Sequence, residues 1–249
     1  MLNIIYGWRV FMRNIKVFYK LYKYNLVINF IEPSLYLFAF GIGLGNYVSD
    51  INGMRYIEYI APGMVCYTGL FAAAFECLYG TYTRMVYQKT FDAILTTPVN
   101  KTGVILGEIF YGAAKAVLFA IIIMIVVYVF GLIRTPYLLL ALPFIWLGGV
   151  IFGGIALVVT ARVKGIESFN YFVTLILSPL MLLSGIFFPL TGLLEKISVV
   201  SPFYQVAKIC QLMAAGEIAA VWSHGLIVIF MAVISVALAL IFMTRRLAQ

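Results

Sequence analysis

VILGEIFYGAAKAVLFAIIIMIVVYVFG, the stretch Val104–Gly131, decides the class of this protein. A helix needs about 20 mostly apolar residues to cross the hydrocarbon core of a bilayer. This stretch exceeds that length and carries only two charged residues, Glu108 and Lys115. It therefore predicts a membrane-spanning helix whose two charged side chains face protein or water instead of lipid.

The composition of the whole chain agrees with a membrane protein. Of 249 residues, 64% are hydrophobic and 10% are charged, which is more apolar surface than a water-soluble domain can bury. The formal charge of +8 does not indicate nucleic acid, because the basic residues flank the apolar stretches. Cys66, Cys77 and Cys210 lack the spacing of a metal site, so we expect neither metal nor disulfide.

The hydropathy pattern predicts an all-α integral membrane fold with six spans in a single domain, 1–249. The expected spans are 26–48, 59–83, 104–131, 137–161, 169–188 and 222–243. Pro62 is expected in the first turn of the second span, where proline is tolerated. Glycines of the fourth span and the Gly41/Gly45 pair of the first predict close contacts between helices.

Residues 1–24 predict an amphipathic helix that lies in the membrane interface. Trp8 and Phe11 belong to its apolar face, and a solvated arm is the alternative. We expect the basic face to contact anionic lipid headgroups. Its members recur at helical spacing: Arg9, Arg13, Lys16, Lys20 and Lys23.

Two further segments are too short to span. Residues 84–98 carry a partial apolar stripe and end at Pro98, which predicts a short cytoplasmic helix, with a solvated loop as the alternative. Residues 190–216 predict a re-entrant pair of short helices in the outer leaflet, with Ser201 as N-cap and Pro202 at the first helical position.

The distribution of Lys and Arg predicts the orientation. Most of the 17 basic residues lie in the N-terminal helix, in 84–101, in the turn at 162–164 and at the C-terminus. Positive residues favour the cytoplasmic side, so both termini are expected there. Arg55, Arg134, Lys196 and Lys208 fall on the other side.

Ionisable residues within spans are costly and normally face protein or water. Lys115 lies one heptad after Glu108, so it shares that helix face about 10 Å deeper, and Glu76 is expected at a depth similar to that of Glu108. These three residues predict an ion-pair network. Two interpretations stay open: the network holds helices together, or it belongs to a polar substrate path.

No catalytic site is predicted, and no G-x-x-x-x-G-K-[ST] phosphate-binding loop occurs in the sequence. Ser184 and His224 lie near the outer ends of the last two spans, and an intramembrane serine protease is the enzymatic alternative. In the alternative interpretation, Ser184 bonds to its own helix backbone and His224 caps a helix.

Four motifs together resemble the permease subunits of type-two ABC exporters, and the resemblance covers essentially the whole chain. Its nearest likeness is to the permeases of nodulation-factor (lipo-chitooligosaccharide) exporters. The motifs are YIAPGMV (Tyr59–Val65), FECLYGTYTRMVYQKTFDAILTTPV (Phe75–Val99), LGEIFYGAAKA (Leu106–Ala116) and SGIFFPL (Ser184–Leu190). After SGIFFPL the chain departs from the family pattern, with Thr191-Gly192-Leu193 and then Ser201–Tyr204.

The resemblance implies that 84–98 is a coupling helix that docks on a cytosolic ABC ATPase. Phe91 and Asp92 are the expected contacts. The expected coupling residues are Tyr87, Gln88, Lys89, Thr90, Phe91, Asp92, Ile94 and Leu95.

The same resemblance implies the partners. Two ATPase chains would bind ATP and magnesium, and a second permease copy, identical or related, would complete the complex in a bacterial cytoplasmic (inner) membrane. The implied cargo is an amphiphile such as a lipooligosaccharide, a glycolipid or a drug-like molecule. An ion-coupled carrier or a channel is the alternative, and it would require binding residues at the bilayer midplane.

Overall fold

A computed structural model describes residues 2–45, 47–48, 50–51, 53–133 and 135–248, with the side chains of 2, 21–30, 32 and 33 excluded. The predicted basic residues Lys23 (by its side chain) and Arg134 therefore lie outside this description. The described chain is helical, and its one β-bridge joins Ile51 and Met54. The α-helices are α1 (Leu2–Phe38), α2 (Tyr56–Phe75), α3 (Thr90–Leu95), α4 (Lys101–Val129), α5 (Leu142–Arg162), α6 (Phe169–Phe172), α7 (Ser178–Leu182), α8 (Leu193–Ser198), α9 (Pro202–Ala215) and α10 (Val221–Arg246).

Four helical stretches of the described chain are long and apolar enough to cross a membrane. They are Tyr56–Tyr87, Lys101–Val129, Pro136–Arg162 and Ile218–Arg246, so four of the six expected spans have a counterpart. The other two correspond to shorter apolar helices, Ser34–Leu44 and Ile166–Leu182. The second of these is divided among 3-10, α- and π-helical pieces and stops short of Gly185, whose φ of +74° suits a turn.

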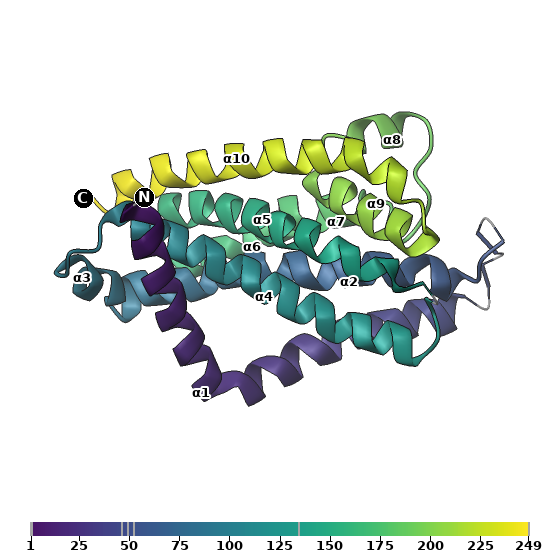
Figure 1. Cartoon of the computed structure of the whole chain (residues 1–249), viewed down its shortest axis with the longest axis horizontal. Helices are drawn as coiled ribbons and strands as arrows, with labels where there is room; N and C mark the ends of the chain where they lie inside the picture. Colours follow the sequence, from purple (N-terminus) through teal and green to yellow (C-terminus); the bar gives the residue numbers. More distant parts are fainter. Residues whose placement is uncertain (1, 46, 49, 52, 134, 249) are drawn as a thin grey trace.

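The core lies where α5 packs among α2, α4 and α10, which run side by side along the length of the molecule (Figure 1). The predicted small contacts of the fourth span are present in α5. A Cβ at Gly149 would lie 2.8 Å from the Cα atom of Ala113 on α4. A Cβ at Gly154 would lie 2.9 Å from the backbone of Ser235 on α10. Small residues thus let the helix backbones approach closely.

The N-terminal helix does not end near residue 24 as expected. α1 continues without interruption from Leu2 to Phe38, bends sharply on the way (Figure 1), and passes into the π-helical segment Ala39–Leu44. No glycine or proline occurs between Gly7 and Pro33, so the sequence holds no residue that would stop a helix there. The expected interfacial helix and first span therefore form one element.

The second long helix begins earlier than expected. α2 starts at Tyr56, because the Glu58 carboxylate accepts a hydrogen bond from the Arg55 backbone N–H at 3.2 Å and so closes the first turn. Pro62 consequently lies inside the helix and not in its first turn, which corrects the expectation. The helical path then continues through two π-helical segments, Glu76–Gly80 and Thr83–Tyr87.

The helix expected over 84–98 is shorter than predicted. Residues up to Tyr87 continue the preceding span, Lys89 adopts a left-handed conformation with φ of 48°, and only Thr90–Leu95 form α3. The hydroxyls of Thr96 and Thr97 then donate hydrogen bonds to nearby carbonyls and end the helix. α3 lies at the same end of the molecule as both chain termini (Figure 1).

The segment expected to form a pair of short helices does contain two, α8 and α9, at the opposite end of the molecule (Figure 1). Ser201 occupies the N-cap position of α9 and Pro202 the first helical position, as predicted. The Ser201 hydroxyl, however, finds no hydrogen-bond partner among the described residues, which corrects its expected capping role. The placement of this pair in a leaflet stays a prediction.

Candidate functional site

Glu76 is the centre of a buried ion-pair network between α4 and the extension of α2. Its carboxylate accepts from Lys115 Nζ at 2.6 Å and pairs with Arg84 Nη1 at 2.7 Å. The three side chains are only 10% (Glu76), 11% (Lys115) and 15% (Arg84) exposed. At this burial water screens the ion pairs poorly, so their contribution to the stability of the folded chain depends on their geometry.

Glu108 on α4 completes the network and is 1% exposed. Its carboxylate accepts hydrogen bonds from Arg84 Nε at 3.1 Å, from the Thr81 hydroxyl at 2.7 Å and from the Asn14 amide at 2.8 Å, and it also pairs with Arg84 Nη2. Because Asn14 belongs to α1, the network joins α1, the α2 extension and α4. A buried carboxylate is stable only with such partners.

Glu76 and Arg84 lie in the two π-helical segments that extend α2, with Gly80 between them. Gly80 leaves the space in which the partners meet, because a Cβ there would lie 2.8 Å from Glu76 Cδ and 3.3 Å from Arg84 Nη1. A side chain at Gly80 would therefore separate this pair.

Aromatic rings surround the Lys115 ammonium. Its Nζ lies 5.5 Å from the ring centroid of Phe18 on α1, 5.7 Å from that of Tyr111 and 6.0 Å from that of Phe119. Each distance is within the range of a cation–π interaction. The rings add attraction for a charge that also borders a polar cavity of about 420 Å³.

The structure brings the three predicted residues into one network, with a difference in detail. Lys115 pairs with Glu76, whereas Glu108 bonds to Arg84, which the sequence assigned to a cytoplasmic segment. The sequence analysis did not predict Asn14 and Thr81 in the network, because a neutral polar side chain within a span gives little hydropathy signal. It could have placed Arg84 within the span, because the apolar residues Met85 and Val86 follow Arg84 directly.

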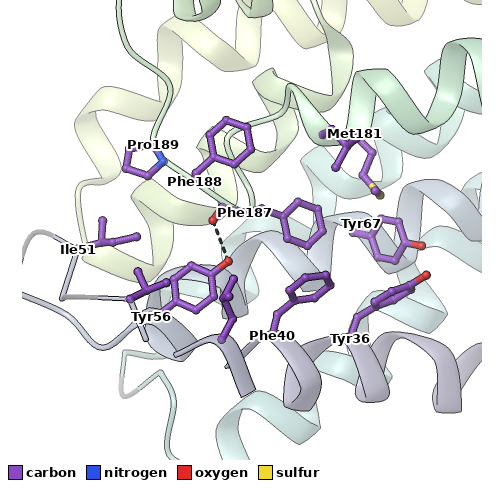
Figure 2. Close-up of a pocket in the computed structure, with 12 residues that line it drawn as sticks. Tyr36, Phe40, Ile51, Tyr56, Tyr67, Met181, Phe187, Phe188 and Pro189 are labelled. Atoms are coloured by element: carbon purple, nitrogen blue, oxygen red, sulfur yellow. Dashed lines mark hydrogen bonds between the residues drawn. The ribbon is translucent and has the colours of Figure 1, made fainter. Parts of the chain in front are cut away.

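The opposite end of the molecule holds a second, apolar cavity of about 540 Å³ between α1, α2 and the chain after α7. Figure 2 shows aromatic side chains from all three around it, with the Tyr36 and Phe40 rings below Tyr67 and Phe187. The ring centroids of Phe40 and Phe187 are 5.4 Å apart. Apolar and aromatic walls of this kind suit the hydrocarbon part of a ligand.

Two of the sequence motifs meet beside that cavity. The Tyr59 hydroxyl donates to the Gly185 carbonyl at 2.8 Å, and Gln211 of α9 donates to the same oxygen at 2.9 Å. A Cβ at Gly63 would lie 2.6 Å from Ile186, so glycine permits this close contact. The motifs YIAPGMV and SGIFFPL are therefore parts of one structural unit.

The expected coupling residues divide into exposed and buried sets. Phe91 is completely buried within this chain's own core, where it anchors α3. Its contact with an ATPase stays a prediction. Thr90, Ile94 and Leu95 are half-buried. The exposed residues are Tyr87, Gln88, Lys89 and Asp92.

The basic face of α1 is largely open to the surroundings. Arg9, Lys16 and Lys20 are exposed, and Arg13 is half-buried, with its Nη1 donating to the Asn14 side-chain oxygen at 3.1 Å. The opposite side of this part of α1 rests on α4, where Gly7 meets Leu106. Its contact with lipid headgroups stays a prediction.

Ser184 and His224 do not form a dyad. The Ser184 hydroxyl donates to the Met181 carbonyl in its own chain segment, as the non-enzymatic interpretation expected. The His224 ring instead bonds through Nδ1 to the Gln205 side-chain oxygen at 2.6 Å, which replaces the expected helix-capping role. The serine protease alternative therefore has no geometric support.

Comparison with known proteins identifies the family to which this chain is similar. Residues 7–211 match the ABC-2 type transporter family. Nodulation protein J of Rhizobium meliloti (strain 1021) is 37% identical over 190 residues, 75% of this chain and 72% of that protein. Nodulation protein J of Rhizobium leguminosarum bv. viciae is 33% identical over 206 residues, 83% of this chain and 78% of that protein. The inner membrane transport permease YadH of Escherichia coli (strain K12) is 24% identical over 197 residues, 79% of this chain and 73% of YadH.

Proposed function

Because this chain belongs to the ABC-2 type transporter permease family, we propose that it is the membrane subunit of an ATP-driven exporter that moves an amphiphile out of the cytoplasmic membrane. Its family is one of transport permeases, and its sequence has no phosphate-binding loop. ATP and magnesium would therefore bind on a separate cytosolic ABC ATPase. Two ATPase chains and a second permease copy would complete the complex.

The exposed residues around α3 are the proposed docking surface for the ATPase. Tyr87, Gln88, Lys89 and Asp92 are exposed at the end of the molecule that also carries both termini (Figure 1). Lys89 in its left-handed conformation turns the chain sharply between the span and α3. This end would face the cytoplasm of a bacterial cell, in agreement with the excess of basic residues at the termini.

One observation carries the proposal: the helical path that holds the buried network ends directly at the docking surface. The helical path runs from Glu76 through Arg84 to Tyr87, two residues before the turn at Lys89. Arg84 holds this path to α4 and, through Glu108 and Asn14, to α1. A displacement of α3 by an ATPase would act first on this path, whose salt bridges and hydrogen bonds contact α4 and α1.

An amphiphilic cargo agrees with the two kinds of cavity. The aromatic cavity of about 540 Å³ offers apolar walls for an acyl chain, and the polar cavity of about 420 Å³ borders Lys115. Glu108 is enclosed by its partners and does not line that cavity, so its proposed role is to hold helices together. A lipooligosaccharide or glycolipid is the proposed cargo.

ATPase stimulation in proteoliposomes tests the docking surface. We would reconstitute the chain with its candidate ATPase and compare Asp92→Ala with Asp50→Ala, a matched change at an exposed residue of the loop before α2. Asp92→Ala should reduce the stimulation of ATP hydrolysis several-fold, and Asp50→Ala should leave it unchanged. Equal stimulation by both variants would refute the assignment of α3.

Transport of a labelled cargo tests its class. Proteoliposomes containing the complex and ATP should accumulate a fluorescent lipo-oligosaccharide, but not the same oligosaccharide after removal of its acyl chain. Equal transport of both would exclude an amphiphile as the required cargo.

A further inference from the structure

A polar cavity and an apolar cavity adjoin where α1 crosses α4. The polar one has a volume of about 420 Å³ and the apolar one about 610 Å³. Phe18, Tyr111 and Lys115 line both, so the two volumes share a wall. Each lies within the range of about 300 to 1,000 Å³ that is typical of small-molecule sites.

The polar cavity carries an excess of positive charge among the described residues around it. Arg13, Arg84 and Lys115 line it, against the carboxylate of Glu76 and that of Glu108 behind it. Arg84 and Lys115 are already engaged in ion pairs with these carboxylates. One cation therefore remains in excess, which favours an anion in the cavity.

Arg13 is that remaining cation. Its Nη1 donates to the neutral side-chain oxygen of Asn14 at 3.1 Å, and no carboxylate of the described chain forms a salt bridge with it. A guanidinium presents several further N–H donors in a planar fork that matches phosphate oxygens. Arg13 is half-buried beside the polar cavity, so its contact with a phosphate there would be stronger than in open water.

The apolar cavity lies on the side where an acyl chain would be expected. Ile15 and Tyr19 of α1 and Ala114 and Leu118 of α4 line it. Leu118 is ten residues beyond Glu108 on α4, about 15 Å farther from the α3 end. A lipid with its headgroup at Arg13 would thus extend its chain away from the α3 end, as a lipid of the adjacent leaflet does.

A third hollow, of about 550 Å³, opens on the outer side of α1. It shares Arg13 and Val17 with the polar cavity and is otherwise lined by exposed basic and apolar residues, including Arg9, Lys16 and Trp8. Basic residues next to a membrane attract anionic lipids. This surface provides a route from the bilayer to Arg13.

We propose that the adjoining cavities between α1 and α4 bind one anionic phospholipid, with its phosphate on Arg13 and an acyl chain against Ala114 and Leu118. The polar cavity belongs to both proposals. Lipid binding to the purified chain needs neither ATP nor transport, so it tests this site independently of the proposed export. A lipid here would brace the bent α1 against α4 beside the ion-pair network.

Lipid binding to the purified full-length chain in detergent tests this proposal. Native mass spectrometry would follow titrations with phosphatidylglycerol, with phosphatidylcholine of the same acyl chains, and with glycerol phosphate as a soluble anion. Arg13→Gln is the principal variant, and Arg245→Gln, at an exposed arginine in the last turn of α10, is its control. Ala114→Trp fills the apolar cavity, and Ala219→Trp at an exposed site is its control.

The wild-type chain should bind phosphatidylglycerol more tightly than phosphatidylcholine. Arg13→Gln should weaken phosphatidylglycerol binding by about tenfold, the loss expected for a charge-assisted hydrogen bond. Ala114→Trp should weaken it comparably, and both controls should match the wild type. Should Arg13→Gln unfold the chain, Arg13→Lys keeps the charge and should retain the preference for phosphatidylglycerol.

Three results would overturn the proposal. Equal lipid binding by the Arg13→Gln and Arg245→Gln variants would show that the overall positive charge attracts the lipid and that Arg13 forms no specific site. Unchanged lipid binding by the Ala114→Trp variant would show that no acyl chain occupies the apolar cavity. Full competition by glycerol phosphate would identify a site for free anions instead of a lipid.

Discussion

Replacing Arg84 by methionine would remove the residue that connects both carboxylates of the buried network. Lys115 would still pair with Glu76, but Glu108 would keep only the neutral donors Thr81 and Asn14. The buried Glu108 carboxylate would then have no salt-bridge partner among the described residues. Methionine is close to the arginine stem in shape, so the change removes charge with little loss of packing.

The size of the effect follows from the burial of the partners. Glu108 is 1% exposed and Arg84 15%, so the small contribution typical of exposed pairs does not apply. Breaking a buried ion pair from one side costs about 3 to 5 kcal/mol. We therefore expect Arg84→Met to lower the free energy of unfolding by about 3 kcal/mol or more. Adding Glu108→Gln should recover part of this loss, because the amide removes the isolated charge.

Equilibrium unfolding in mixed micelles with a denaturing detergent, followed by circular dichroism, would measure these values. Arg55→Met is a control at the N-cap of the same helical stretch, since the Arg55 side chain is 67% exposed and its ion pair with Glu58 should contribute at most about 1 kcal/mol. The reasoning is wrong if Arg84→Met costs no more than Arg55→Met. It is also wrong if Glu108→Gln makes Arg84→Met still less stable.

Three further changes test the same geometry. Gly80→Ala should lower the free energy of unfolding by about 1 to 3 kcal/mol, because the new Cβ would press on the Glu76 carboxylate, whereas Gly43→Ala, which has open space, should have little effect in the same unfolding assay. Lys115→Met should lower the free energy of unfolding by less than Arg84→Met does, because Glu76 still pairs with Arg84. Unchanged stability together with lost transport would instead favour a role of Lys115 in a substrate path. Ser184→Ala should leave labelled-cargo transport at the wild-type level, and a complete loss with normal folding would reopen the nucleophile interpretation.

Much of the fold was predictable from local patterns. The apolar runs predicted the long helices Lys101–Val129 and Ile218–Arg246 within a few residues. Two boundaries were wrong. The left-handed Lys89 that shortens the expected coupling helix has only a weak sequence signal. The uninterrupted α1 did have one, since no glycine or proline occurs between Gly7 and Pro33. The candidate site was predicted in part, as Lys115 and Glu76 do pair.

The sequence by itself determined that this chain resides in a membrane and that its buried charges must find partners, because the free energy of transferring a residue into the bilayer depends mainly on that residue and its neighbours. Only the tertiary structure decided which partners they find. Arg84 enters the network because the extension of α2 packs against α4 beside Glu108, and Asn14 does so because α1 crosses α4 at that depth. Such a meeting of three separate helices depends on packing over long sequence separations, which no local pattern records.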